Sequence, residues 1–435
     1  MQRIRITGAL VSVCLLCSYG LADDGRYAGG DSISKTVFAT QRGINSFETG
    51  SPVREALFHQ GRIYAKEDGR AGTFQVAVFG GRSEEGRDLA RYFLPNGQSR
   101  ITVANELASE AENRDVDARH LNIDVGERPF KSTLSFVPEV DYVAGGFSWK
   151  QALYYDACDN PQFWFEVGAP VVHVETNMDI SENFVEGVDA DPLTDANGNV
   201  VTGLNGDPRI SEARQFFSQK GVTFGRIDAG THSETQLPHL ELKVGFNSIM
   251  TDACYMNSYV GLVVPTSDKY NGQDNDDKCK TFRQVLQPLV GTADHTGIMF
   301  GSHIGFCVCD WGDSKFSVTM DVHNRYLFED EEWRTFDLIG KPWSRYMEFY
   351  DGEEQAVRAQ NLRLQGDRAR ARGVGTSGVN VLTQKTCVTP GYNGRVNTGF
   401  ILEKCNCVFE FGANVNYQQA EEIRLNRLKG EFALK

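Results

Sequence analysis

Apolar and polar positions alternate most clearly over residues 296–328. In the first half, Ile298 and Phe300 lead a series of apolar residues that alternates with glycines and with His303. A short polar turn at 310–313 follows, and the second half alternates again. A period of two predicts two strands, each with one apolar and one polar face. Each strand spans about 14 residues, more than the ~5–6 usual in soluble sheets and enough to cross a bilayer at a tilt.

The same alternation predicts further strands over 73–81, 132–155, 163–176, 240–247, 256–264, 396–402 and 407–417. The segment 132–155 is one very long strand or two strands interrupted near Pro138. Short connections at 156–161, 251–253, 310–313 and 404–406 alternate with long ones at 179–236, 267–294 and 329–394. This order is typical of outer-membrane barrels. We therefore predict an all-β fold, a transmembrane antiparallel β-barrel of roughly 10–14 strands with short periplasmic turns and long outer loops. A secreted soluble all-β protein is the alternative.

The first 22 residues have the organisation of a secretory signal peptide. Arg3 and Arg5 precede a short apolar core, and Gly20 and Ala22 supply small residues before a cleavage site. A buried N-terminal strand is the alternative. We expect a polar lead-in over 23–70 and the barrel over 71–435, with 424–435 resembling a strand that has been cut short. No segment after the signal peptide approaches the ~18 consecutive apolar residues of a transmembrane helix.

The chain is acidic, with 44 basic and 58 acidic residues and a formal net charge of −14. Loss of Arg3 and Arg5 with the signal peptide makes this more negative, which argues against nucleic acid as a partner. For a pore, it predicts a mild cation preference. The polar positions of the strands would line such a pore: Glu166, Glu241, Lys243, Lys315, Thr319, Asp321, His323 and Arg325.

Eight cysteines follow the signal peptide, and export to an oxidising compartment predicts disulfides among them. Six lie at the short turns and therefore on one rim: Cys158, Cys254, Cys307, Cys309, Cys405 and Cys407. Cys279 and Cys387 lie in the long loops. Zinc bound by the two Cys-x-Cys pairs and free thiols are the alternatives, but this spacing is unusual for zinc, and we predict no metal.

Five arginines lie in a segment of helix-forming composition inside the last long connection: Arg358, Arg363, Arg368, Arg370 and Arg372. We predict a loop folded into the pore, where these arginines would face Glu166, Glu241 or Asp321 and form a constriction. Contact with lipopolysaccharide phosphates and a solvated helix face are the alternatives.

Three short runs carry a resemblance. Residues 261–266 resemble the strand end before an outer loop of many outer-membrane proteins. Residues 334–338 and 340–348 resemble segments of porin-like proteins of host-associated bacteria. The plan of a cysteine-bearing barrel with an exported N-terminus is similar to that of chlamydial-type major outer membrane proteins. The resemblance implies a porin-like barrel and supplies no catalytic residues.

These patterns predict a porin of the bacterial outer membrane that allows passive diffusion of small hydrophilic solutes. We expect no enzyme activity and no cofactor, because neither a Gly-x-Ser-x-Gly motif nor a comparable Ser-His-acid set is present. The expected partners are outer-membrane lipid, lipopolysaccharide, the solutes, and neighbours held as a homo-oligomer or by disulfides. The alternative is a structural or adhesive surface protein that is anchored by a plugged barrel and linked by disulfides.

Overall fold

The computed structural model describes residues 72–83, 86–94, 98–123, 125, 128–155, 161–187, 210–227, 230–251, 253–267, 285–286, 288, 290–338, 341, 343–364, 375–404, 407–425 and 432–434. The predicted signal peptide and lead-in lie outside these residues. The fold is mostly β, as the sequence predicts.

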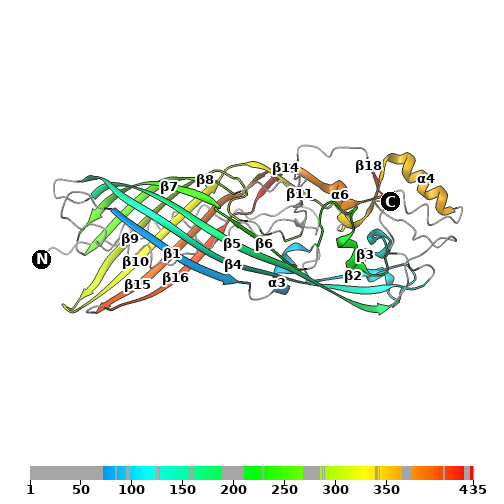
Figure 1. Cartoon of the computed structure of the whole chain (residues 1–435), viewed down its shortest axis with the longest axis horizontal. Helices are drawn as coiled ribbons and strands as arrows, with labels where there is room; N and C mark the ends of the chain where they lie inside the picture. Colours follow the sequence, from blue (N-terminus) through cyan, green and yellow to red (C-terminus); the bar gives the residue numbers. More distant parts are fainter. Residues whose placement is uncertain are drawn as a thin grey trace.

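One antiparallel meander, which we call the nine-strand sheet, forms the body of the molecule (Figure 1). Its strands follow one another in chain order: β1 (Gly72–Arg82), β4 (Lys131–Tyr155), β5 (Pro161–Glu186), β7 (His239–Met250), β8 (Cys254–Pro265), β9 (Gly297–Asp310), β10 (Ser314–Leu327), β15 (Gly391–Lys404) and β16 (Cys407–Gln418). Three short strands extend it: β2 (Arg100–Ala104), β3 (Val116–Asp117) and β6 (Thr231–Gln236).

The predicted segment around Pro138 is one continuous strand, β4, which pairs with β5 along its whole length. Proline lacks the N–H that a central strand donates, so it is confined to strand edges and bulges. Pro138 lies between the residues that pair with β2 (131–135) and those that pair with β1 (141–151). Because β4 is locally an edge there, the proline does not interrupt the strand.

The nine-strand sheet is not closed. Within the described part of the chain, no ladder joins β1 to β16. The eight pairings between neighbours are all antiparallel, so β1 and β16 run in the same direction. The described residues therefore form a mostly β fold built on an open sheet.

Few residues separate β4 from β5, β7 from β8, β9 from β10 and β15 from β16, and the long connections lie at the opposite end. The long connections differ from the loops that the sequence predicts, because they contain regular structure and meet in one unit, here called the head (Figure 1). Its helices are α3 (Gly86–Phe93), α4 (Gly352–Leu364), α6 (Gly378–Leu382) and the 3-10 turns η1 (Ala111–Asn113), η2 (Ala118–Leu121), η4 (Ala213–Ser218) and η5 (Ser344–Tyr346).

Two small sheets complete the head. One contains β11 (Asp330–Thr335), β14 (Thr383–Thr389) and β17 (Glu422–Arg424), and the other contains β13 (Thr376–Ser377), β12 (Glu348–Asp351) and β18 (Phe432–Leu434). The segment 424–435, which resembles a barrel strand cut short, thus contributes β18 to the head and does not extend the nine-strand sheet.

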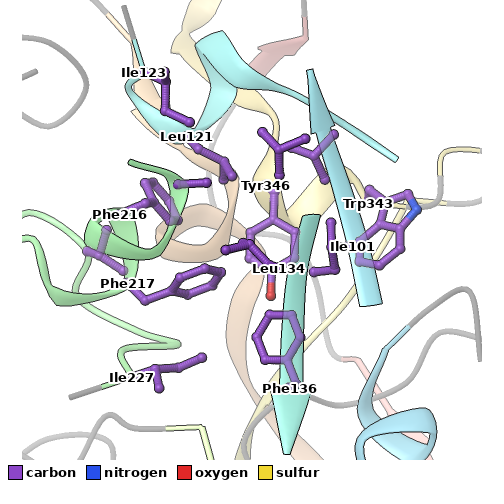
Figure 2. Close-up of a cluster of buried hydrophobic side chains, with 14 of the residues drawn as sticks. Ile101, Leu121, Ile123, Leu134, Phe136, Phe216, Phe217, Ile227, Trp343 and Tyr346 are labelled. Atoms are coloured by element: carbon purple, nitrogen blue, oxygen red, sulfur yellow. The ribbon is translucent and has the colours of Figure 1, made fainter. Parts of the chain in front are cut away.

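A hydrophobic core holds the head together (Figure 2). Four long connections lead from β1 to β4, from β5 to β7, from β8 to β9 and from β10 to β15. All four supply fully buried or nearly buried residues, including Ile101, Leu121, Phe216, Phe217, Leu286, Trp343 and Tyr346. Phe216, Phe217 and Tyr346 meet edge to face, the arrangement that aromatic rings favour. Burial raises the pKa of the Tyr346 hydroxyl to about 12.

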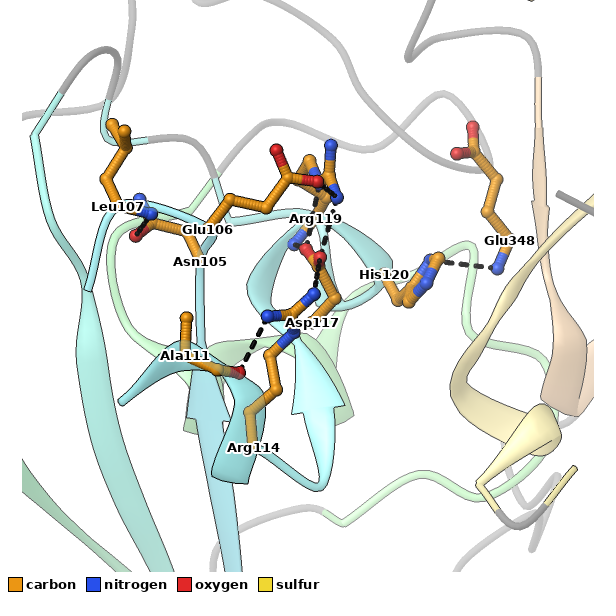
Figure 3. A network of polar contacts seen from close by, with 9 residues as sticks. All are labelled: Asn105, Glu106, Leu107, Ala111, Arg114, Asp117, Arg119, His120 and Glu348. Carbon is orange, nitrogen blue, oxygen red and sulfur yellow. Dashed lines mark hydrogen bonds and ion pairs between the residues drawn. The ribbon is translucent and has the colours of Figure 1, made fainter. Parts of the chain in front are cut away.

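A polar network borders this core (Figure 3). The Asp117 carboxylate accepts hydrogen bonds from the Arg119 backbone N–H at 3.0 Å and side-chain Nε at 2.9 Å, and Arg114 donates to it at 3.1 Å. Burial by itself would raise the pKa of Asp117, but the hydrogen bonds and charge of Arg119 outweigh it and lower the pKa to about 2. These contacts tie the strand β3 to η2 and explain why a buried carboxylate is tolerated there.

Candidate functional site

The two faces of the nine-strand sheet have the opposite polarity to those of a soluble protein. The face with buried side chains, here called the inner face, carries charged and polar residues, whereas large apolar side chains on the outer face are exposed. The exposed ones come from eight of the nine strands, for example Phe74, Phe147, Phe163, Val244, Val260, Phe300, Phe400 and Phe411. On β10, the outer apolar residues Phe316, Val318 and Met320 are half-buried. An exposed apolar surface on so many strands is unlike the small patches of soluble monomers.

The polarity reverses within single strands. On β5, the outer face is apolar at Phe163 and Val171 and polar at Asp179 and Ser181. On β4, the inner face changes from Leu134 in the head to Ser148 and Lys150 in the sheet. The reversal marks the boundary between a part that folds around an apolar core and a part that does not.

Seven of the eight predicted pore-lining residues lie buried on the inner face: Glu166, Glu241, Lys243, Thr319, Asp321, His323 and Arg325. The eighth, Lys315, is half-buried beside the β9–β10 turn, where its cross-strand neighbours are Asp310 and Glu403. The alternation of strand residues therefore identifies side chains that share one face of the sheet. Nearly all of them are shielded from bulk solvent.

One charge cluster is centred on Glu241 of β7. Lys243 Nζ lies 3.0 Å from its carboxylate and Arg325 Nη2 lies 2.7 Å from it, while His239 Nε2 lies at 3.4 Å. Lys243 also reaches Glu166 of β5 at 3.4 Å. Because each carboxylate faces at least one cation, the desolvation cost of these buried charges is partly offset.

A second cluster is centred on Asp321 of β10. His303 contacts its carboxylate, and Asn397 Nδ2 donates to it at 2.9 Å. Arg395 Nη2 lies at 3.8 Å, too far for a strong pair. Three strands, β9, β10 and β15, thus meet at this carboxylate.

Aromatic rings lie across the inner face between the clusters. The Trp164 ring covers Gly245 on the next strand, and the Tyr259 ring covers Gly301, where in each case a Cβ atom would collide with the ring. Lys150 Nζ lies 3.6 Å above the Trp164 ring, a cation–π contact. These rings occupy space that the glycines leave, so the glycines do not widen the interior.

The predicted pore-lining set left out further members of the network, among them Lys150, His239, Tyr259, His303, Arg395 and Asn397. The same signal could have found them, because all lie at the polar positions of the alternating strands. Arg395 and Asn397, for instance, alternate with the apolar residues of the predicted strand 396–402.

The predicted arginine constriction is not observed at its one described side chain. Arg358 lies exposed on α4 in the head, which packs against β12 and β18, and it does not face Glu166, Glu241 or Asp321. The backbone of Arg363 lies on the same helix, and Arg368, Arg370 and Arg372 lie outside the described residues. The carboxylates that these arginines were predicted to face already have partners on the inner face. Glu166 and Glu241 contact Lys243, and Asp321 contacts His303.

No disulfide joins two of the described cysteines, and Cys254, Cys307 and Cys309 are free thiols. All three lie at the short-turn end of β8 and β9, whereas Cys387 lies on β14, not in a loop. Cys158, Cys279 and Cys405 lie outside the described residues, and of Cys407 only the backbone is described.

In the part of the chain that the structure describes, no group of three or more His, Cys, Asp or Glu side chains could hold a metal ion. None of the described helices is long and apolar enough to span a membrane. The sequence matches no known family, and no curated protein is similar to it.

Proposed function

We propose that this protein is an outer-membrane β-barrel that lets small hydrophilic solutes cross, with the charged inner face as the narrowest part of the path. The observation that carries the proposal is the inverted polarity of the nine-strand sheet. In water, exposed apolar area costs about 25 cal/mol per Å², whereas in a bilayer the same surface faces hydrocarbon.

The extent of the apolar surface fits a bilayer. On β5, the outer apolar stretch runs from Phe163 to Val171. Eight residue steps of ~3.3 Å, at a tilt of ~40°, give a band of roughly 20 Å, close to the ~25 Å band of outer-membrane barrels. Closure would join β1 to β16. Since these edges run in the same direction, that seam would be parallel, or a further strand would complete it.

The charges of the inner face favour a path for solutes. Replacing buried ion pairs by apolar residues is often neutral or stabilising, so ion pairs are weak devices for stability alone. Moreover, His323 Nε2 and Asn397 Oδ1 have no hydrogen-bond partner among the described residues. Buried polar atoms in that situation are ordinarily hydrated, which is consistent with water inside the sheet.

A second candidate function is a surface anchor with a filled barrel. Two observations favour it: the inner side chains are almost completely buried, and the long connections build a folded head with its own core. In this case lipid and lipopolysaccharide would surround the sheet, and the head would carry the activity at the surface.

Planar-bilayer recording of the refolded protein separates the two. A porin gives discrete ohmic steps, and Tyr259→Ala, which removes a ring from the inner face, raises the conductance. Tyr154→Ala is the matched control, because Tyr154 is exposed on the outer face and its loss leaves the conductance unchanged. If wild type and Tyr259→Ala both stay silent while folded and heat-modifiable, the porin proposal is wrong and the anchor is favoured.

A further inference from the structure

We propose that His323 of β10 and Arg395 of β15 form a binding site for a small anion on the inner face, which makes the path selective for anions. The inference rests on the proposed function for its consequence, the selectivity. The site itself depends only on the contacts of these two residues and their neighbours.

The two side chains are direct cross-strand neighbours on the same face of the sheet. Such neighbours have Cβ atoms about 5 Å apart, so their polar groups share one small volume. Only 7% of His323 and 6% of Arg395 is exposed. Any ligand between them would therefore lose most of its contact with bulk water.

Donors at this position lack acceptors. Arg395 Nε and Nη1 and His323 Nε2 have no hydrogen-bond partner among the described residues. Tyr259 lies with its hydroxyl 2.5 Å from His323 Nδ1. When that hydroxyl donates, the neutral imidazole carries its proton on Nε2, which becomes a third N–H donor beside the guanidinium.

The surrounding charges also favour an anion. Asp321 is the nearest acid, but its carboxylate already accepts from Asn397 at 2.9 Å and lies 3.8 Å from Arg395. Across the buried inner face, the basic side chains Lys150, Lys243, Arg325 and Arg395 outnumber the acidic side chains Glu166, Glu241 and Asp321 by one. This balance is opposite in sign to the net charge of −14 of the whole chain.

The cation preference expected from overall composition is thereby replaced by an anion preference. Solutes in a narrow path respond to the charges that line it, because more distant surface charges are screened over about 10 Å at moderate salt. A partly dehydrated anion beside a guanidinium gains charge-assisted hydrogen bonds. The ligand class is a small anion such as chloride or the carboxylate of a small metabolite.

The test combines two measurements on the refolded full chain, with chloride as the probe. The first is the broadening of the chloride NMR line by the detergent-folded protein, which reports binding without any need for conduction. We expect broadening with wild type and with Arg395→Lys, and its loss with Arg395→Gln. Arg358→Gln, on the exposed face of α4, is the control that should broaden the line as wild type does.

The second measurement is the reversal potential in a potassium chloride gradient. A unit charge about 5 Å from an ion in water changes its local concentration by about fourfold, so Arg395→Gln should lower the chloride preference by at least about fourfold. Broadening without conduction would leave the site standing and refute the porin. Conduction without broadening, or selectivity equal in wild type and Arg395→Gln, would overturn the anion site.

Discussion

Replacing Val244 by arginine tests whether the outer face of the nine-strand sheet contacts lipid. Val244 lies in the middle of β7, and 56% of it is exposed. Its neighbours on the same face are Leu242 and Phe246 along the strand and Phe165 and Val260 across it. In a soluble protein, such an exposed position accepts an arginine within about 0.5 kcal/mol.

In a bilayer the expected cost is much larger. Because apolar residues surround Val244 on all four sides, it lies well inside the apolar band. An arginine near the midplane of a transmembrane barrel costs about 2–4 kcal/mol. We therefore expect Val244→Arg to lower the folded-to-unfolded ratio in vesicles by about 30-fold to 900-fold.

The chain offers a control of the same residue type and exposure. Val185 lies on the outer face of β5, 54% exposed, but beyond the apolar stretch and next to polar residues such as Asn183. We expect Val185→Arg to change the free energy of unfolding by less than about 0.5 kcal/mol. The assay is reversible urea unfolding in phospholipid vesicles, followed by tryptophan fluorescence and by the shift in electrophoretic mobility.

Equal, small effects of Val244→Arg and Val185→Arg would refute the reasoning. That result would mean that the apolar face meets water or another protein surface. Equal, large effects would also count against it, because they would show a general sensitivity of strands to arginine and no dependence on the band.

Three further outcomes follow from the packing. The pKa of Asp117 is lowered from 3.8 to about 2, so its charge stabilises the head above about pH 4 and loses this effect as the pH falls towards 2. Asp117→Asn disrupts the contacts with Arg119 and should lower the free energy of unfolding by about 2 kcal/mol at pH 7 and by progressively less in acid. Urea unfolding at several pH values measures this difference. Gly245→Ala places a methyl group against the Trp164 ring and should cost about 1–3 kcal/mol, seen as a lower temperature for the loss of heat-resistant electrophoretic mobility. Phe216→Ala empties a fully buried position in the head core and should cost about 3–5 kcal/mol, seen as faster trypsin cleavage of the head while the mobility of the sheet is retained.

The strands of the sheet could be predicted because their signal is local. The strands predicted within 296–328 are found as Gly297–Asp310 and Ser314–Leu327. Each alternating run also specifies which residues share a face, so Glu241 and Lys243 could be assigned to one surface before their contact was known. The length of β4 could not be predicted, because Pro138 ordinarily ends a central strand. The proline is tolerated because neither β1 nor β2 pairs with β4 at that position. That arrangement depends on two segments distant in sequence.

The head could not be predicted in the same way. Its core draws single apolar residues from four connections, for example Leu121, Phe217, Leu286 and Trp343, which are up to about two hundred residues apart. The elements that hold them are mostly short 3-10 turns without a period to detect. Likewise, no sequence pattern reveals that the rings of Trp164 and Tyr259 lie over glycines of the neighbouring strands, because that depends on the register between strands.

The odd number of strands in the meander has a consequence for how the chain is threaded. The chain enters the sheet at Gly72, beside the short turns, and leaves it at Gln418, beside the head. An even meander would bring both of these points to one side. Here the two points lie at opposite ends of the sheet. If the sheet spans a membrane as proposed, a segment fused before β1 and a segment fused after β16 would emerge on opposite sides of it, so a single copy could tether a partner on one side to a partner on the other.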